Sequence, residues 1–135
     1  MSDSSLILIV EDNEANQLLA RAVLELEGYE VRVAGSGPEA FDVLNECTPD
    51  LILMDVQLPG QDGLTITRLL KDNPATASIP VVALTAHAMT GDRQLAITAG
   101  CAGYISKPIE TRTFASQVRH FLSTSFDGDR RLVAQ

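Results

Sequence analysis

The sequence predicts an α/β fold of the doubly wound type, a three-layer sandwich in which helices cover both faces of a parallel five-stranded sheet. Three apolar runs without polar alternation, at residues 6–10, 51–54 and 81–84, are typical of strands buried on both faces. Stretches with helical spacing separate these runs from each other and from two weaker strands, so that strand and helix alternate five times. Because each crossover is right-handed, we expect the carboxyl ends of all the strands at one edge of the sheet.

Length and composition indicate one globular domain. The chain has 135 residues, of which 45% are hydrophobic and 21% charged, and this fits a single domain with its own core. We assign residues 6–122 to the domain, 1–5 to an N-terminal extension and 123–135 to a short, frayed C-terminal tail. Cys47 and Cys101 form neither a metal-binding nor a disulfide pattern.

The charge of the chain restricts its partners. A net charge of -8 argues against binding to nucleic acid or to an anionic membrane, because both normally need a basic face. No apolar run approaches the roughly 20 residues of a membrane span, and the N-terminus does not resemble a secretory leader. We therefore expect a cytoplasmic chain whose partners are proteins.

The first strand, at 6–10, ends in the acid pair Glu11 and Asp12. Asp12 or Asn13 can cap the helix that follows, and Gly28 suits its C-terminus. That helix is indicated by apolar residues at helical spacing, namely Leu18, Ala22, Val23 and Leu26.

An alternating segment at 30–33 is typical of a strand at the margin of the sheet. Ser36 and Glu39 have the spacing of a capping box, which predicts a second helix that ends before Pro49. We expect its inner face to carry Phe41 and Leu44.

The central apolar run, 51–54, leads directly into Asp55, and Gly60 then permits a sharp turn. Asp62 can cap a third helix, which Pro74 ends. The apolar residues of this helix are Leu64, Leu69 and Leu70.

The run at 81–84 ends at Thr85, and a weaker helix is expected over 88–98, with Gly100 marking its end. A short final strand at 102–105 precedes Lys107. The last helix has an apolar stripe made of Phe114, Val118, Phe121 and Leu122.

Polar residues follow the strands at the edge where open α/β sheets bind their ligands. This topology brings together Glu11, Asp12, Asp55, Thr85 and Lys107. Each of them alone fits a helix cap or a solvated charge. Their shared position indicates a single site.

The residue types in this set favour phosphoryl transfer. Three crowded carboxylates repel each other, and Mg²⁺, a hard cation with oxygen ligands, removes that repulsion. A carboxylate nucleophile can accept a phosphoryl group as an acyl phosphate, and we assign this role to Asp55. Thr85 and Lys107 would then hold phosphoryl oxygens by hydrogen bond and charge.

These landmarks resemble the receiver domains of two-component response regulators, whose pattern is an acid pair, an acceptor aspartate, a threonine or serine, and Lys-Pro. The resemblance covers about residues 6–122 and includes the segment that ends in Lys107 and Pro108. It implies a flavodoxin-like (βα)5 fold with strand order 2-1-3-4-5 and a cis peptide before Pro108. It also implies that the backbone carbonyl of Gln57 is a metal ligand, that Thr85 is the switch threonine and that Tyr104 is an aromatic switch.

Many receivers have two aspartates where this chain has Glu11 and Asp12. We favour Asp12, the shorter side chain, as the direct ligand of Mg²⁺, with Glu11 acting through water.

We therefore expect a stand-alone, single-domain response regulator of a phosphorelay. It would accept a phosphoryl group on Asp55 from a histidine kinase or a histidine phosphotransfer protein, with Mg²⁺ bound. Its signal would reach a downstream protein target through the 88–122 face. Such a protein assists its own phosphorylation and dephosphorylation but is not a turnover enzyme.

Three alternative interpretations fit parts of the sequence. Residues 35–40 fit a dinucleotide-binding glycine pattern, but Pro38 removes a backbone donor there and the acid pair stays unexplained. A receiver-like scaffold that is never phosphorylated is a closer alternative, against which the complete site argues. Tyr104 can also be a fixed packing residue instead of a switch.

Overall fold

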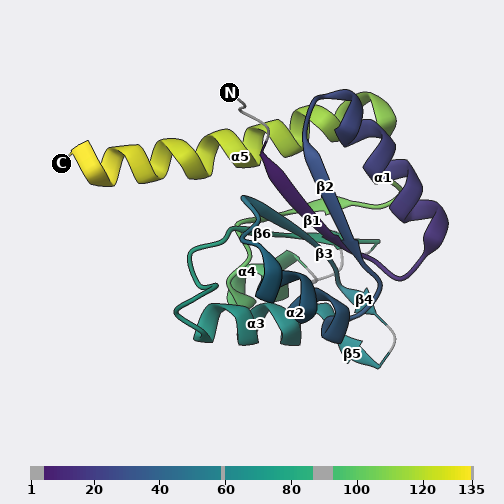
Figure 1. Ribbon diagram of the computed structural model, residues 1–135, viewed down its shortest axis with the longest axis horizontal. Helices are drawn as coiled ribbons and strands as arrows, with labels where there is room; N and C mark the ends of the chain where they lie inside the picture. The colour runs from purple at the N-terminus through teal and green to yellow at the C-terminus, as the bar shows by residue number, and fades with distance from the viewer. Residues whose placement is uncertain (1–4, 59, 87–92, 135) are drawn as a thin grey trace.

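Five parallel strands form the central sheet of the computed structural model, within the residues that it describes: 5–58, 60–86 and 93–134. In spatial order they are β2 (Glu30–Ala34), β1 (Leu6–Val10), β3 (Leu51–Asp55), β6 (Val81–Thr85) and β7 (Gly103–Ser106). All neighbouring pairs are parallel, and Figure 1 labels β1, β2, β3 and β6 in the sheet. This confirms the doubly wound fold, the order 2-1-3-4-5 and the marginal place of the alternating strand.

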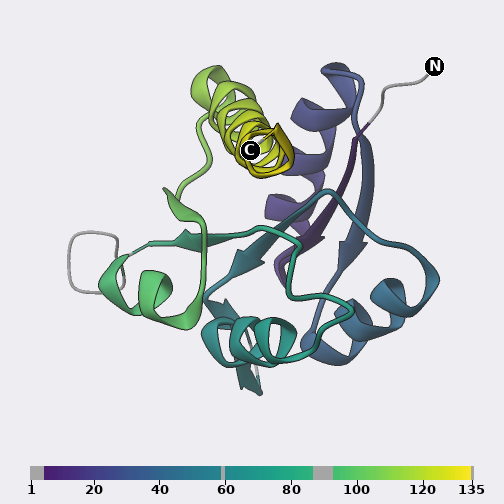
Figure 2. The same cartoon turned by 90° about the vertical axis from the view of Figure 1, so that its left-hand side faces the viewer.

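Helices cover both faces of the sheet (Figure 2). One layer contains α1 (Glu14–Leu26) and α5 (Thr111–Ala134), and the other contains α2 (Gly37–Glu46), α3 (Gly63–Asp72) and α4 (Arg93–Ala99). Alternate residues of each central strand serve the two layers, as expected of a pleated strand. In β1, for example, Ile7 and Ile9 pack in the α1/α5 core, whereas Leu8 and Val10 pack in the other.

The expected starts and ends of α1, α2 and α3 are confirmed, as is the end of α4 at Gly100. Asn13, Ser36 and Asp62 each accept a backbone hydrogen bond in the first turn of α1, α2 and α3. Gly28 and Gly100 follow α1 and α4 with φ of 94° and 106°, a region that favours glycine.

Two expected helix faces are wrong in part. On α1, Leu18 and Leu26 are 66% and 87% exposed, and the buried residues are Ala20 and Leu24. Both sets have helical spacing, and spacing alone does not tell which of two apolar stripes faces the sheet. On α3, Leu69 is likewise exposed.

The buried side of α3 contains Ile66 and Thr67 in addition to the expected Leu64 and Leu70. Thr67 is accommodated because its hydroxyl donates to the carbonyl of Gly63, which satisfies the buried polar group. On α2, the expected Phe41 and Leu44 are only partly buried, and Ala40 and Val43 lie deeper.

The connection after β3 is more ordered than the turn that the sequence predicts. It forms an antiparallel pair of short strands, β4 (Gln57–Leu58) and β5 (Gln61–Asp62). Gly60, with φ of 78°, provides the expected sharp turn between them.

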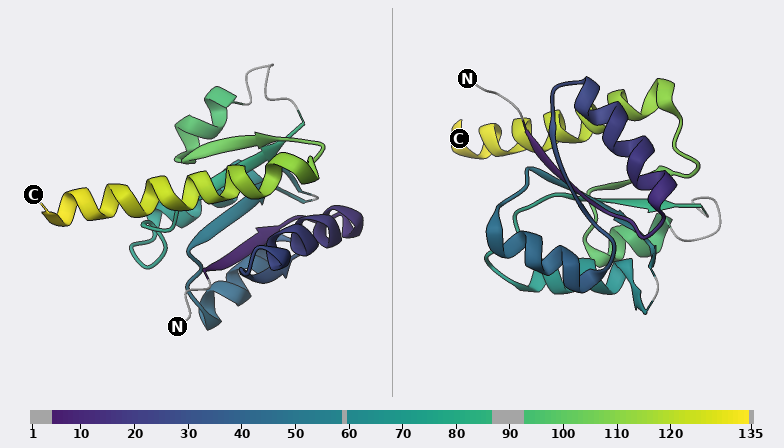
Figure 3. Two further views of the ribbon diagram at one scale, coloured as in Figure 1. Left: turned by 90° about the horizontal axis from the view of Figure 1, so that it is seen from above. Right: turned by 45° about the vertical axis from the view of Figure 1, so that its right-hand side comes forward.

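The last helix is longer than expected. α5 continues past Leu122 to Ala134, so the segment expected to be a frayed tail is helical and extends beyond the sheet (Figures 1 and 3). The only proline near this helix, Pro108, precedes it, so nothing in the segment blocks continuation of the backbone hydrogen bonds. The expected start of the preceding helix, at residue 88, lies outside the described residues. Within the described part, α4 begins at Arg93. None of the helices in the described part combines the length and apolar character that a membrane span needs.

Candidate functional site

The predicted site residues meet at the carboxyl edge of the sheet. β1 lies between β2 and β3 and pairs Val10 with Met54, so the residues that follow, Glu11 and Asp55, are also neighbours. β6 adds Thr85 beside the end of β3. Lys107 follows β7, and its backbone N–H donates to the carbonyl of Thr85 at 2.8 Å.

The three acids form one cluster. Each of Glu11, Asp12 and Asp55 offers a carboxylate oxygen, and these oxygens all lie within 4.8 Å of one another. Glu11 and Asp55 are buried, with 1% and 3% exposure, whereas Asp12 is exposed. Two buried carboxylates and one on the surface thus make a negatively charged site that is open to solvent on one side.

Lys107 pairs with both buried acids. Its Nζ lies 3.0 Å from Glu11 Oε1 and 3.2 Å from Asp55 Oδ2. Burial by itself lowers the pKa of Lys107, but the interactions with Glu11 and Asp55 outweigh burial, so the pKa is raised and the side chain stays charged at neutral pH. The peptide between Lys107 and Pro108 is cis, as expected.

Asp55 is held by backbone as well as by charge. Its Oδ1 accepts the N–H of Gln57 at 3.0 Å, which fixes the carboxylate over the start of β4. Burial has the largest effect on Asp55 and raises its pKa, and the negative charge of Glu11 raises the pKa further. The hydrogen bond from Gln57 and the positive charge of Lys107 lower the pKa. The net pKa is above the ordinary value.

The cluster fits a hard divalent cation. Both oxygens of the buried Glu11 have partners, because Oε1 lies 3.0 Å from the ammonium of Lys107 and Oε2 accepts the N–H of Asn13 at 3.1 Å. Asp12, in contrast, is exposed. Oxygen ligands from carboxylates are the donors that Mg²⁺ prefers, and the exposed Asp12 lies on the side from which an ion would enter.

Thr85 and Tyr104 occupy the strands next to the cluster. Thr85 is 2% exposed at the end of β6, close to Asp55 in the adjacent strand. Tyr104 lies in β7, paired in register with Ala83, and packs partly buried against the core below α3 and α4. The two residues are therefore on neighbouring strands.

Sequence reasoning missed Gly63. A Cβ at Gly63 would lie 2.0 Å from the carbonyl oxygen of Asp55. The N–H of Gly63 donates to the carbonyl of Val56 at 3.0 Å. The start of α3 therefore touches the backbone that carries Asp55. The glycine directly after the helix cap Asp62 was the available signal.

Gln17 was missed as well. Its Nε2 donates to the backbone carbonyl of Glu11 from the first turns of α1. No sequence pattern in the chain marks this contact, because a glutamine near the start of an amphipathic helix is ordinarily a surface residue.

Comparison with known proteins identifies the class. The family model for the response regulator receiver domain matches residues 7–119, and the chain belongs to this family of two-component receivers. The polar-differentiation response regulator DivK of Brucella ovis is 47% identical over 116 residues, covering 86% of this chain and 94% of that protein.

Solved structures agree on the fold. A putative response regulator from Chloroflexus aurantiacus superposes with a TM-score of 0.84 at 33% identity, covering 90% of this chain and 99% of that one. The receiver domain of the sensor histidine kinase PA1611 from Pseudomonas aeruginosa superposes with a TM-score of 0.78 at 34% identity, covering 90% of this chain and 97% of that one. That structure contains a magnesium ion coordinated in its active-site cleft.

Proposed function

We propose that this protein is a single-domain response regulator of a phosphorelay that accepts a phosphoryl group on Asp55. The observation that carries the proposal is the position of Lys107, whose ammonium lies between Glu11 and Asp55. A cation held against a buried carboxylate can offset the charge that a phosphoryl group brings to it.

The transfer needs one bond to form and one to break. A carboxylate oxygen of Asp55 bonds to phosphorus while the P–N bond of a phosphohistidine donor breaks, and the released imidazole takes up a proton. The donor is a histidine kinase or a histidine phosphotransfer protein. Lys107 holds one phosphoryl oxygen by charge, and the hydroxyl of Thr85 donates to another.

Four groups would hold the metal: the carboxylates of Glu11, Asp12 and Asp55 and the backbone carbonyl of Gln57. Bound there, Mg²⁺ would neutralise charge on the phosphoryl oxygens during transfer. Of the acid pair, the exposed Asp12 is the direct ligand in this proposal, and the buried Glu11 acts through water and through Lys107.

Removal of the metal is expected to stop phosphorylation, since the incoming phosphoryl group would meet three carboxylates with little to offset their repulsion. Asp12→Ala should weaken Mg²⁺ binding by tenfold or more in a calorimetric titration, since loss of a direct ligand should cost at least as much as loss of an outer-shell partner, which costs about 10–100-fold. Asp42→Ala, an exposed acid on α2, is the matched control and should bind as the wild type does. Equal affinities for Asp12→Ala and Asp42→Ala would place the metal elsewhere.

The signal would leave the site through Thr85 and Tyr104. Thr85 moves toward the phosphoryl oxygens, and Tyr104 turns inward on β7, which changes the surface formed by α4, β7 and α5. This surface, within the 88–122 face, contacts the downstream protein target. The protein acts as a signalling protein of the cytoplasm and not as a turnover enzyme.

The phosphoryl analogue beryllofluoride, added with Mg²⁺, should shift amide resonances in α4 and β7 of the wild type and much less in Thr85→Ala. Thr48→Ala, at an exposed position, serves as the control and should respond fully. If the shifts in the wild type stay confined to the neighbours of Asp55, Tyr104 is a fixed packing residue and the relay must be abandoned.

A further inference from the structure

The turn between β1 and α1 is held by a side chain from the helix itself. Gln17 lies in the first turns of α1, and its Nε2 donates to the backbone carbonyl of Glu11. The same residue's backbone N–H donates to the carbonyl of Asn13 at 3.0 Å. The backbone bond is the ordinary first bond of the helix, so of these two contacts only the side chain of Gln17 links α1 to Glu11, which follows β1.

The carbonyl that Gln17 holds belongs to the peptide unit joining Glu11 to Asp12. On its other side, Glu11 is fixed by its N–H, which donates to the carbonyl of Ala34 in β2 at 2.9 Å. The Glu11 side chain is fixed by the N–H of Asn13, which donates to Oε2 at 3.1 Å. These contacts hold the amide and the side chain of Glu11, and the contact with Gln17 holds its carbonyl, from which the chain continues to Asp12.

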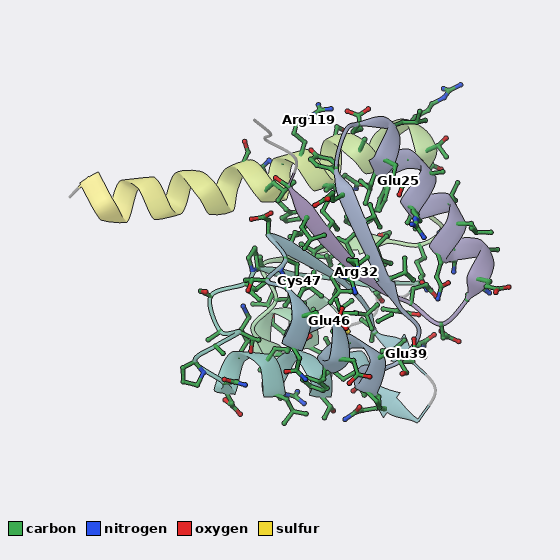
Figure 4. All side chains as sticks on the ribbon, in the orientation of Figure 1. Glu25, Arg32, Glu39, Glu46, Cys47 and Arg119 are labelled. Carbon is green, nitrogen blue, oxygen red and sulfur yellow. The ribbon has the colours of Figure 1, made fainter. Side chains whose placement is uncertain are left out.

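Gly35 lies beside this contact. A Cβ there would be 3.8 Å from Gln17 Nε2, an ordinary contact distance, and 3.3 Å from Glu39 Oε1. Glu39, labelled in Figure 4 on the first turn of α2, accepts the N–H of Gly35 at 2.7 Å and holds the β2–α2 turn in place. The end of β1 is therefore supported by α1 on one side and by the β2–α2 turn on the other.

We propose that Gln17 is a positioning residue of the metal site, which orients the Glu11–Asp12 peptide so that the acid pair faces Asp55. This inference rests on the proposed function, because it concerns the same site. Mg²⁺ demands near-ideal octahedral geometry, so a small reorientation of one ligand lowers its affinity. Loss of an outer partner of a ligand typically weakens metal binding about 10–100-fold.

Two variants separate positioning from charge. Gln17→Met keeps the length of the side chain and removes its donors. Gln17→Glu keeps its shape but places an acceptor against the Glu11 carbonyl and adds a negative charge near the acid cluster. Charge alone would strengthen Mg²⁺ binding in Gln17→Glu, whereas the loss of positioning weakens it. Gln94→Met, at an exposed position on α4, is the matched control.

The experiment is a calorimetric titration of MgCl₂ into the full chain, with thermal unfolding of each variant measured alongside. We expect Gln17→Met and Gln17→Glu to bind Mg²⁺ about tenfold more weakly than the wild type, and Gln94→Met to bind equally well. Wild-type affinity in Gln17→Met, or tighter binding in Gln17→Glu, would overturn the positioning role even if the unfolding midpoint fell, since Gln17 would then serve only the stability of α1. A wild type that binds no Mg²⁺ would instead overturn the proposed metal site itself.

Discussion

Asp55→Asn is expected to abolish phosphorylation by any phosphohistidine donor. The substitution keeps the shape of the side chain and its acceptor for the Gln57 N–H, but it replaces the nucleophilic carboxylate by an amide. Incorporation of labelled phosphate should fall at least 100-fold, to the background of the assay, as expected when the only attacking group is lost.

The matched control is Asp72→Asn, which removes an exposed carboxylate at the end of α3. It should accept phosphate at the wild-type rate. The Asp55→Asn protein should also fold normally, because Lys107 keeps its pairing with Glu11. Wild-type labelling of Asp55→Asn would show that another residue is the acceptor.

The second large effect is expected at Gly63, where any side chain meets backbone. A Cβ there would lie 2.0 Å from the carbonyl oxygen of Asp55, 2.9 Å from its carbonyl carbon and 3.0 Å from Val56 Cα. Backbone atoms cannot rotate away as a side chain can, so α3 must move outward and its hydrogen bond from Gly63 N–H to Val56 is lost.

We expect Gly63→Ala to lower the free energy of unfolding by about 3 kcal/mol, the upper end of the usual range for overpacking. Urea denaturation measures this loss. The control is Gly28→Ala, where a Cβ meets nothing within 4 Å and only the positive φ opposes the substitution. That variant should lose about 1 kcal/mol. A Gly63→Ala protein as stable as the wild type would mean that α3 does not approach Asp55 so closely.

The chain order of strands and helices follows from local sequence patterns. The runs that end at Glu11, Asp55 and Thr85 are uninterrupted and apolar, and each is a buried strand in the sheet. Because parallel strands place their carboxyl ends together, the predicted site could be assembled without knowledge of any contact. The family resemblance supplied the strand order and the cis peptide before Pro108.

Contacts between distant segments were not predictable in the same way. Leu18 and Leu24 both lie on apolar stripes of α1, and only the docking of α1 on the sheet decides that Leu24 is buried. The contacts of Gln17 and Gly63 depend on where α1 and α3 begin relative to the strand ends. Such distances are set by three-dimensional packing, which residue spacing does not encode.

The central claim, that Asp55 carries the phosphoryl group, can be tested on the wild-type protein by locating the acyl phosphate after phosphorylation. Reduction of the phosphorylated chain with borohydride converts a phosphorylated aspartate to homoserine, which peptide mass spectrometry can place. We predict homoserine at position 55, dependent on Mg²⁺ during phosphorylation and absent from the unphosphorylated chain. Homoserine at position 12 instead of 55, or a phosphoryl group on a residue that borohydride leaves unchanged, would contradict this account.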